Sequence, residues 1–223
     1  DIRVATLYAY GFPHLGPTWV TGYGIASLMK REKDDVVCLQ EFIDDRTFPP
    51  DSIAKLFASH MSWFIHQEGQ AILSRFPIVG HRYVRFPGSG NDYLQADVKI
   101  GGDTVRIFSV HLQTSGISSL RHRFRKDHDR DVPVERVIGE LERNSRIRAQ
   151  QVREIRTVID STRYPVIVAG DFNDTPSSYT YRQLKGGMTD GFRAVGGLRS
   201  RSLGPEQGRE GQQDGDEQDF FIV

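Results

Sequence analysis

The chain alternates between short apolar runs and longer amphipathic stretches, a pattern that predicts strands and helices in turn. Residues 134–161 repeat apolar side chains at largely helical spacing, which predicts a long helix packed on a sheet. We interpret the polar Glu and Arg residues of this helix as its solvated face. Residues 18–32 also fit a helix, although Gly22 and Gly24 weaken it. A short helix is expected from about residue 50 to residue 60, capped by Asp51.

Between these helices, runs of β-branched and aromatic residues separated by glycine and proline predict strands. We expect strands at residues 2–8, 35–41, 63–66, 71–74, 79–86, 94–100, 104–112 and 166–171, and a further hydrophobic strand close to residue 223. The turns fall at residues 87–91 and 101–102. No internal repeat interrupts this order.

The most informative predicted strand starts at Val166 and runs directly into Asp171, Asn173 and Asp174. Alternation along a strand places Asp171 and Asn173 on one face, with Phe172 turned into the core. A carboxylate beside an amide can hold a hard cation, orient a water molecule or bind a phosphate oxygen. The same residues are also typical of an Asx-type turn that closes a strand. Composition alone favours neither interpretation.

Two other predicted strands also end in a polar group. Val37 and Leu39 lead to Glu41, and Val105 and Ile107 lead to His111. In open sheets, ligands gather outside the carboxyl ends of strands, so we expect these side chains to share one rim. A single histidine at a strand end is usually structural, and the inference therefore depends on the whole set.

Five segments in this order resemble the endonuclease/exonuclease/phosphatase superfamily, the DNase I-like metal-dependent phosphodiesterases. They are Leu39-Gln-Glu41, Ala71-Ile-Leu-Ser-Arg-Phe-Pro-Ile78, Val110-His-Leu-Gln113, Gly170-Asp-Phe-Asn-Asp174 and Asp219-Phe-Phe-Ile-Val223. Residues 164–181 are most similar to its bacterial branch. The resemblance covers nearly the whole chain and implies a single domain over residues 1–223. It also implies an α/β (α+β) fold: a four-layer α/β/β/α sandwich of two mixed, mostly antiparallel sheets flanked by helices.

The resemblance also implies a role for individual residues. Glu41 corresponds to the principal ligand of Mg²⁺, for which Mn²⁺ can substitute. Asp171 corresponds to the residue that positions or deprotonates the attacking water, and Asn173 to the amide that binds the scissile phosphate. His111 corresponds to a phosphate contact that can donate a proton to the leaving oxygen, and Gln70 to the residue that supports this histidine.

The chain departs from the family pattern at two places. Asp219 corresponds to an aspartate that orients the histidine of a later Ser-Asp-His motif, and no such motif occurs in the 223 residues. We expect that the natural protein continues beyond Val223. Tyr8 stands where the family has an asparagine, and a phenol cannot offer the paired donor and acceptor of an amide. Reduced activity is therefore expected, and the alternative is a catalytically impaired binding module for phosphate ligands.

Composition fits a globular enzyme core. The 29 acidic and 29 basic residues give no overall basic field that would attract nucleic acid. Residues 121–130 are a basic segment that suits a phosphate backbone or an anionic head group, but interleaved acids favour a flexible surface insertion. Residues 204–217, rich in Gly, Gln and acids, predict a mobile loop near the rim.

The implied partner is a phosphoester: nucleic acid, a phospholipid head group or an inositol phosphate. No protein partner is indicated, and we expect a monomer. Cys38, the single cysteine, cannot form an internal disulfide and leaves the redox compartment open. The sequence contains no signal peptide or lipidation motif, and an extracytoplasmic location would require that a targeting segment had been removed.

Overall fold

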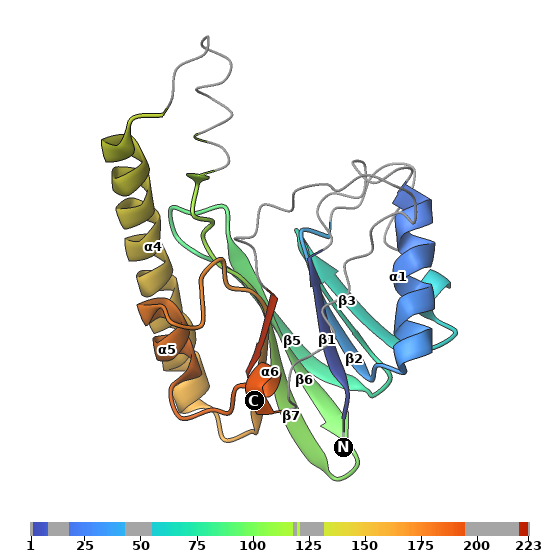
Figure 1. Ribbon diagram of the computed structural model, residues 1–223. Coiled ribbons are helices and arrows are strands. Elements are labelled where there is room, and N and C mark those ends of the chain that lie inside the picture. The colour runs from blue at the N-terminus through green and yellow to red at the C-terminus, as the bar shows by residue number, and fades with distance from the viewer. Residues whose placement is uncertain are drawn as a thin grey trace.

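Two β-sheets packed face to face lie at the centre of the computed structural model, which describes residues 2–8, 18–42, 55–117, 120, 132–194 and 219–222 (Figure 1). The first sheet has the order β1 (Val4–Tyr8), β2 (Val36–Gln40), β4 (Gln70–Ser74), β3 (Trp63–Gln67). The second has the order β5 (Ile78–Arg85), β6 (Asp92–Ile100), β7 (Asp103–His111), β8 (Val166–Asp171), β9 (Asp219–Ile222). The pairs β1–β2 and β7–β8 are parallel, and the other neighbours are antiparallel.

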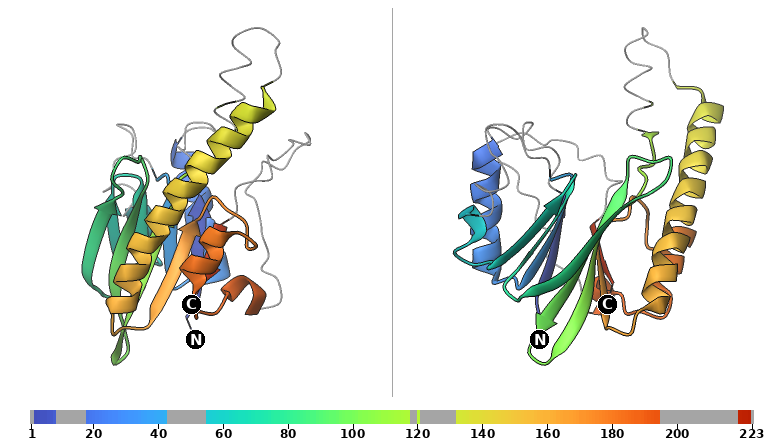
Figure 2. Two further views of the ribbon diagram at one scale, coloured as in Figure 1. Left: turned by 90° about the vertical axis from the view of Figure 1, so that its left-hand side faces the viewer. Right: turned by 180° about the vertical axis from the view of Figure 1, so that it is seen from behind.

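Helices cover the outer face of each sheet, which completes the predicted four layers (Figure 2). Helix α1 (Thr18–Glu32) packs on the first sheet, and α4 (Val134–Ser161) and α5 (Tyr179–Lys185) pack on the second. The short helix α6 (Gly191–Ala194) precedes β9 in the chain. Among the residues described, three hydrophobic clusters separate the layers: one under α1, one under α4 and α5, and one between the sheets. The expected sandwich is confirmed.

Strand β2 shows how the sequence builds two of these clusters at once. Val37 and Leu39 pack under α1, whereas Val36 and Cys38 pack between the sheets. Because side chains alternate along a strand, a strand buried on both faces is apolar throughout. The same alternation carries Gln40 into the space between the sheets at the end of the strand. The apolar layer between the sheets therefore becomes polar at this rim.

Helix α4 has the predicted bounds, but the expectation that all its charged residues face solvent is wrong. Arg148 is buried, with 5% of its surface exposed. Val134 and Ile138 near the start of the helix are instead exposed. Figure 1 shows the reason, because the first turns of α4 extend beyond the ends of the strands and leave no sheet against which apolar side chains can pack.

Strands β7 and β8 approach each other closely at Gly170. This residue has φ +146°, a conformation that side chains disfavour. A Cβ atom at this position would lie 2.0 Å from the carbonyl oxygen of Val110. Glycine is therefore required directly before Asp171.

Several sequence-based expectations lie outside the described residues. They are the start of the helix near residue 50, the basic segment 121–130, the loop 204–217 and the side chains of Tyr8 and Asp219. In the part of the chain that is described, no helix is long and apolar enough to span a membrane.

Candidate functional site

Five ionisable residues form a row across the second sheet at the rim where its polar residues gather. In the strand register, Arg85 pairs with Asp92, Asp92 with His111, His111 with Asp171, and Asp171 with Asp219. Residues directly opposite each other on neighbouring strands project from the same face of a sheet. The fold thus places His111, Asp171 and Asp219, which are far apart in sequence, side by side in the backbone.

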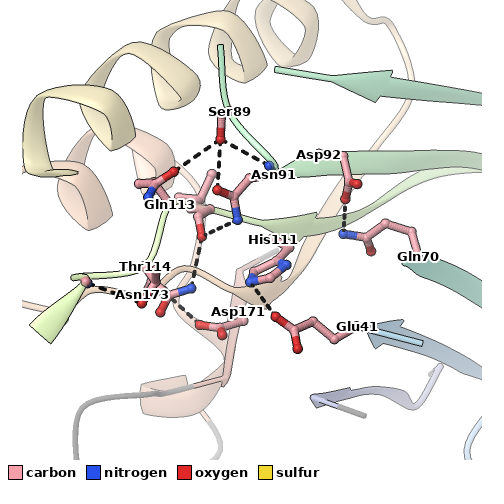
Figure 3. A network of polar contacts seen from close by, with 12 residues as sticks. Glu41, Gln70, Ser89, Asn91, Asp92, His111, Gln113, Thr114, Asp171 and Asn173 are labelled. Carbon is pink, nitrogen blue, oxygen red and sulfur yellow. Dashed lines mark hydrogen bonds and ion pairs between the residues drawn. The ribbon is translucent and has the colours of Figure 1, made fainter. Parts of the chain in front are cut away.

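Glu41 reaches this row from the first sheet. It directly follows β2, and its carboxylate Oε1 lies 3.8 Å from Nε2 of His111 (Figure 3). Its φ of +49° is uncommon outside glycine, and strained backbone of this kind clusters at functional sites. The next residue fixes the turn, because the N–H of Phe42 donates to the carbonyl oxygen of Gly69 at 2.9 Å. Glu41 and His111, predicted to share a rim, are neighbours in space.

Asp171 and Asn173 form a tight, buried turn. The backbone N–H of Asn173 donates to Oδ1 of Asp171 at 2.8 Å, and Nδ2 of Asn173 donates to the carbonyl oxygen of Leu112 at 2.9 Å. Asn173 has φ +50°, which asparagine tolerates better than most residues. The Asx-type turn suggested by the sequence is present, and it places the amide of Asn173 beside the carboxylate of Asp171. The turn and a functional pair are therefore compatible.

A chain of buried hydrogen bonds connects the two sheets beneath the rim. Gln40 donates to Ser109 at 2.8 Å, Ser109 donates to Oε1 of Gln70 at 2.7 Å, and Nε2 of Gln70 donates to Oδ1 of Asp92 at 2.8 Å. Tyr83 donates to the other oxygen of Asp92 at 2.9 Å. Gln70, predicted to support the histidine, thus binds the residue that lies opposite His111 in the sheet.

Sequence reasoning missed Asp92 and Tyr83. The predicted strand began at residue 94 and the predicted turn ended at Asn91, so Asp92 fell between the two predicted elements. Hydrogen bonds from buried Gln70 and half-buried Tyr83 keep Asp92 within β6 instead. Asp92 and His111 lie on the two strands of the β6–β7 hairpin. Their spacing in the sequence identifies them as neighbours once the register of this hairpin is known.

Burial shifts the pKa values of the central pair in opposite directions. It raises the pKa of Asp92, while the hydrogen bonds from Gln70 and Tyr83 and the charge of His111 act against this rise. Burial lowers the pKa of His111, and the charge of Asp92 acts in the opposite direction. His111 is therefore mainly neutral at pH 7, with one ring nitrogen as a donor and the other as an acceptor.

A cleft of about 600 Å³ opens beside these residues. It is lined by Glu41, His66, Glu68, Gly69, Tyr83, Arg85, Gly90, Asp92 and His111. Asp171 is buried and does not line the cleft, but it pairs with His111, which does. A second cavity, of about 550 Å³, lies at the opposite strand ends against Val105 and Val166 and contains none of the candidate residues. The chemistry therefore belongs to the first cleft.

Glu41 is the residue best placed to hold a divalent cation. Within the described ranges, no group of three His, Cys, Asp or Glu side chains is arranged to bind a metal. Mg²⁺ does not need such a group, because it is commonly held by one or two carboxylates, water and substrate phosphates. The carboxylate of Glu41 is one third exposed and faces the cleft, so this donor set fits Mg²⁺.

Comparison with known proteins identifies the class of protein to which this two-sheet fold belongs. The profile described as the Endonuclease/Exonuclease/phosphatase family matches residues 21–218. This chain belongs to that family. No curated protein matches the sequence significantly.

Solved structures show the same fold at low sequence identity. TDP2 from D. rerio, crystallised with a single-strand DNA product, is 17% identical with a TM-score of 0.60, over 99% of this chain and 82% of that one. Sphingomyelinase C from Streptomyces griseocarneus is 18% identical with a TM-score of 0.58, over 83% and 69% of the two chains. A beta toxin mutant from Staphylococcus aureus with bound magnesium ions is 16% identical with a TM-score of 0.55, over 82% and 69%.

Proposed function

We propose that this chain is a Mg²⁺-dependent phosphoester hydrolase of the bacterial branch, with its site at the rim between the sheets. The observation that carries the proposal is the convergence of Glu41, His111 and Asp171. The carboxylate of Glu41 lies 3.8 Å from His111, and His111 pairs with Asp171 across β7 and β8. The family contains endonucleases, exonucleases and phosphatases, which all act on phosphate esters.

Each residue takes the role that the resemblance to the family implies. Asp171 aligns the attacking water and takes up its proton. The amide of Asn173 and the imidazole of His111 donate hydrogen bonds to phosphate oxygens, where negative charge accumulates during attack. When held by Glu41, Mg²⁺ supplies the positive charge that offsets this accumulation, and Mn²⁺ can substitute for it. Asp219 lies next to Asp171 in the register, and the resemblance to the family assigns it the role of an orienting carboxylate.

The cleft also supports an anionic substrate. Arg85 is exposed at its wall, and its positive charge acts on Tyr83 and Asp92. A phosphoester with a second polar or charged group that reaches Arg85 fits this wall, whereas carboxylates line the rest of the cleft, namely Glu41, Glu68 and Asp92. Nucleic acid, phospholipid head groups and inositol phosphates all meet this description.

A panel of these three substrate classes tests the proposal, with Mg²⁺, Mn²⁺ or a chelator added. We expect hydrolysis that the chelator stops and that Glu41→Gln and Asp171→Asn each reduce by about 10³-fold or more. Glu142→Gln removes an exposed carboxylate on α4 and is expected to leave turnover unchanged. Turnover that survives in the Glu41 or Asp171 variant would reject the assignment.

A phosphate-binding module without turnover is the second candidate, and the observation that favours it is Tyr8. This tyrosine pairs with Gln40 at the end of β1, next to Glu41, where the family has an asparagine. Calorimetric binding of a phosphoester to the Glu41 cleft without hydrolysis, in the presence of either metal, would favour this candidate.

A further inference from the structure

The inner face of α4 changes from apolar to polar near the candidate site. Asn144, Arg148 and Gln151 are buried, and their i, i+4, i+7 spacing places them on one face of the helix. The same stripe continues toward the end of the helix with Ile155 and Ile159, which pack on the second sheet. The polar stripe therefore occupies positions where the pattern of the helix would place apolar side chains.

The polar stripe binds the chain segment that follows His111. Nδ2 of Asn144 donates to the carbonyl oxygen of Ser115 at 2.8 Å. The backbone N–H of Gln113 donates to Oε1 of Gln151 at 2.9 Å. This segment has left the sheet, and α4 takes over the backbone hydrogen bonds that a strand neighbour would otherwise make.

Arg148 contacts this segment and a second one. Its Nη1 donates to the carbonyl oxygen of Gln113 at 3.0 Å, and its Nε donates to Oδ2 of Asp174 at 3.1 Å. Gln113 lies two residues after His111, and Asp174 directly follows Asn173. One guanidinium therefore joins the segment after β7 to the segment after β8.

The geometry of this connection is restrictive. The Arg148 side chain is 6% exposed and its Asp174 partner 13%, so the pair is shielded from competing water. Guanidinium is a rigid planar fork, which fixes the two acceptors relative to each other. The amide of Asn173 spans the same two segments, because it donates to the carbonyl oxygen of Leu112. The orientation of the Asn173 amide thus depends on the distance between these two segments, which Arg148 sets.

We propose that Arg148 is a positioning residue for the phosphate-binding groups. By joining Gln113 to Asp174, it holds the imidazole of His111 and the amide of Asn173 in the arrangement that one phosphate requires. The catalytic part of this inference rests on the proposed hydrolase function, whereas the structural part does not. Misplacement of reacting groups by about 1 Å can cost about 10²-fold in rate, so the effect belongs in kcat more than in KM.

The test compares Arg148→Met with Arg156→Met, a matched change on the same helix. Arg156 lies eight residues further along α4 and donates to the carbonyl oxygen of Leu184 at the far end of the sheet. For each variant, the side-chain amide of Asn173 is followed by ¹⁵N NMR, together with the thermal midpoint, kcat and KM.

We expect Arg148→Met to shift the Asn173 side-chain resonances, speed their hydrogen exchange by about tenfold or more, and lower kcat by about 10²-fold with little change in KM. Arg156→Met should lower the thermal midpoint while leaving the Asn173 signals and kcat unchanged. Arg148→Lys keeps the charge without the fork, and Asp174→Asn keeps the shape without the charge. Both variants should show the same changes in the Asn173 signals and in kcat, to a smaller extent. If Arg148→Met does not fold, these two variants test the proposal in its place.

Unchanged Asn173 signals in the Arg148 variants would overturn the proposal. The proposal would also fail if Arg156→Met changed the Asn173 signals as much as Arg148→Met does when both variants lose the same thermal stability. If the unaltered protein hydrolyses no phosphoester, the proposed function fails, but the Asn173 signals still decide whether Arg148 positions this site.

Discussion

Arg85 is the cationic residue in the cleft that is best placed to distinguish substrates. It lies on the same face of β5 as Tyr83, and both line the cleft. We expect Arg85→Gln to raise KM about tenfold, equivalent to about 1.4 kcal/mol, with little change in kcat, because a distal contact contributes equally to binding of substrate and transition state.

The matched control for this change is Arg82→Gln. Arg82 is exposed on the same strand but on the opposite face, because it lies three positions before Arg85 and side chains alternate along a strand. Steady-state kinetics on the best phosphoester should show no effect of this control. A fall in kcat without a change in KM for Arg85→Gln would mean that Arg85 acts on the transition state instead.

At the residue scale, sequence reasoning found the polar groups that end apolar strands and missed those whose partners are remote. Glu41, His111 and Asp171 each come at the end of an apolar strand. Their proximity could be expected because the ends of such strands meet at one edge of a sheet. Asp92 and Arg148 could not be identified in this way, because their burial is explained by hydrogen bonds to residues distant in sequence. The roles of all five residues stay predictions.

Among the strands, the β7–β8 pair depends most on one residue. A side chain at Gly170 would need an unfavourable φ and would collide with the backbone of Val110. Gly170→Ala should therefore lower the free energy of unfolding by more than about 3 kcal/mol, or prevent folding. Gly102→Ala, at a turn position where a Cβ meets nothing within 4 Å, should change it by less than about 1 kcal/mol. Urea denaturation measures the free energy of unfolding of both variants. Equal changes in the two variants would contradict the prediction, because they would show that the strands can move apart at Gly170 at little cost.

The turn between α1 and β2 predicts a pH-dependent stability. Burial, followed by the nearby charge of Glu32, raises the pKa of Asp34 from 3.8 to about 6. The folded protein then binds a proton at pH values where the unfolded chain has released it. Stability should therefore fall as the pH rises from about 4 through about 6, and the loss should persist above that range.

Asp34→Asn should remove this dependence and stabilise the protein at pH 8 by on the order of 1 kcal/mol, a value reduced for solvent screening of a partly exposed group. Denaturation at pH 4, 6 and 8 measures the effect. Asp103→Asn, an exposed acid in the β6–β7 hairpin, serves as the control. A pH profile of Asp34→Asn that parallels that of the unaltered protein would contradict the assignment.

Element bounds were predictable where a periodic pattern was long. Helices α1 and α4 have the expected bounds, because their apolar stripes extend over several turns. Strand β6 begins two residues earlier than expected, at Asp92. Hydrogen bonds from Gln70 and Tyr83 offset the cost of placing this polar residue within the strand. Such compensation depends on the partner sheet and leaves no local pattern in the sequence.

At the scale of the whole molecule, the packing of two sheets explains why the site lies at a rim. Apolar side chains fill the space between the sheets along most of the strands, and Gln40, Gln70 and Ser109 replace them at one end. Alternation along single strands predicts which residues face inward, but it does not specify strand order. The layering was expected only from the resemblance to the family, and the structure confirms the four-layer fold and supplies the strand order.

The claim on which the proposed function depends is that a divalent cation binds Glu41 beside His111 and Asp171. Titration of ¹⁵N-labelled protein with substoichiometric Mn²⁺ tests it most directly, because the paramagnetic ion broadens the NMR signals of nearby nuclei. We predict that broadening is centred on the backbone amides of Glu41, Gly69 and His111, is reversed by excess Mg²⁺ and disappears in Glu41→Gln. Broadening that persists in Glu41→Gln, or that is centred on the acidic turn at Asp34 and Asp35, would contradict the account.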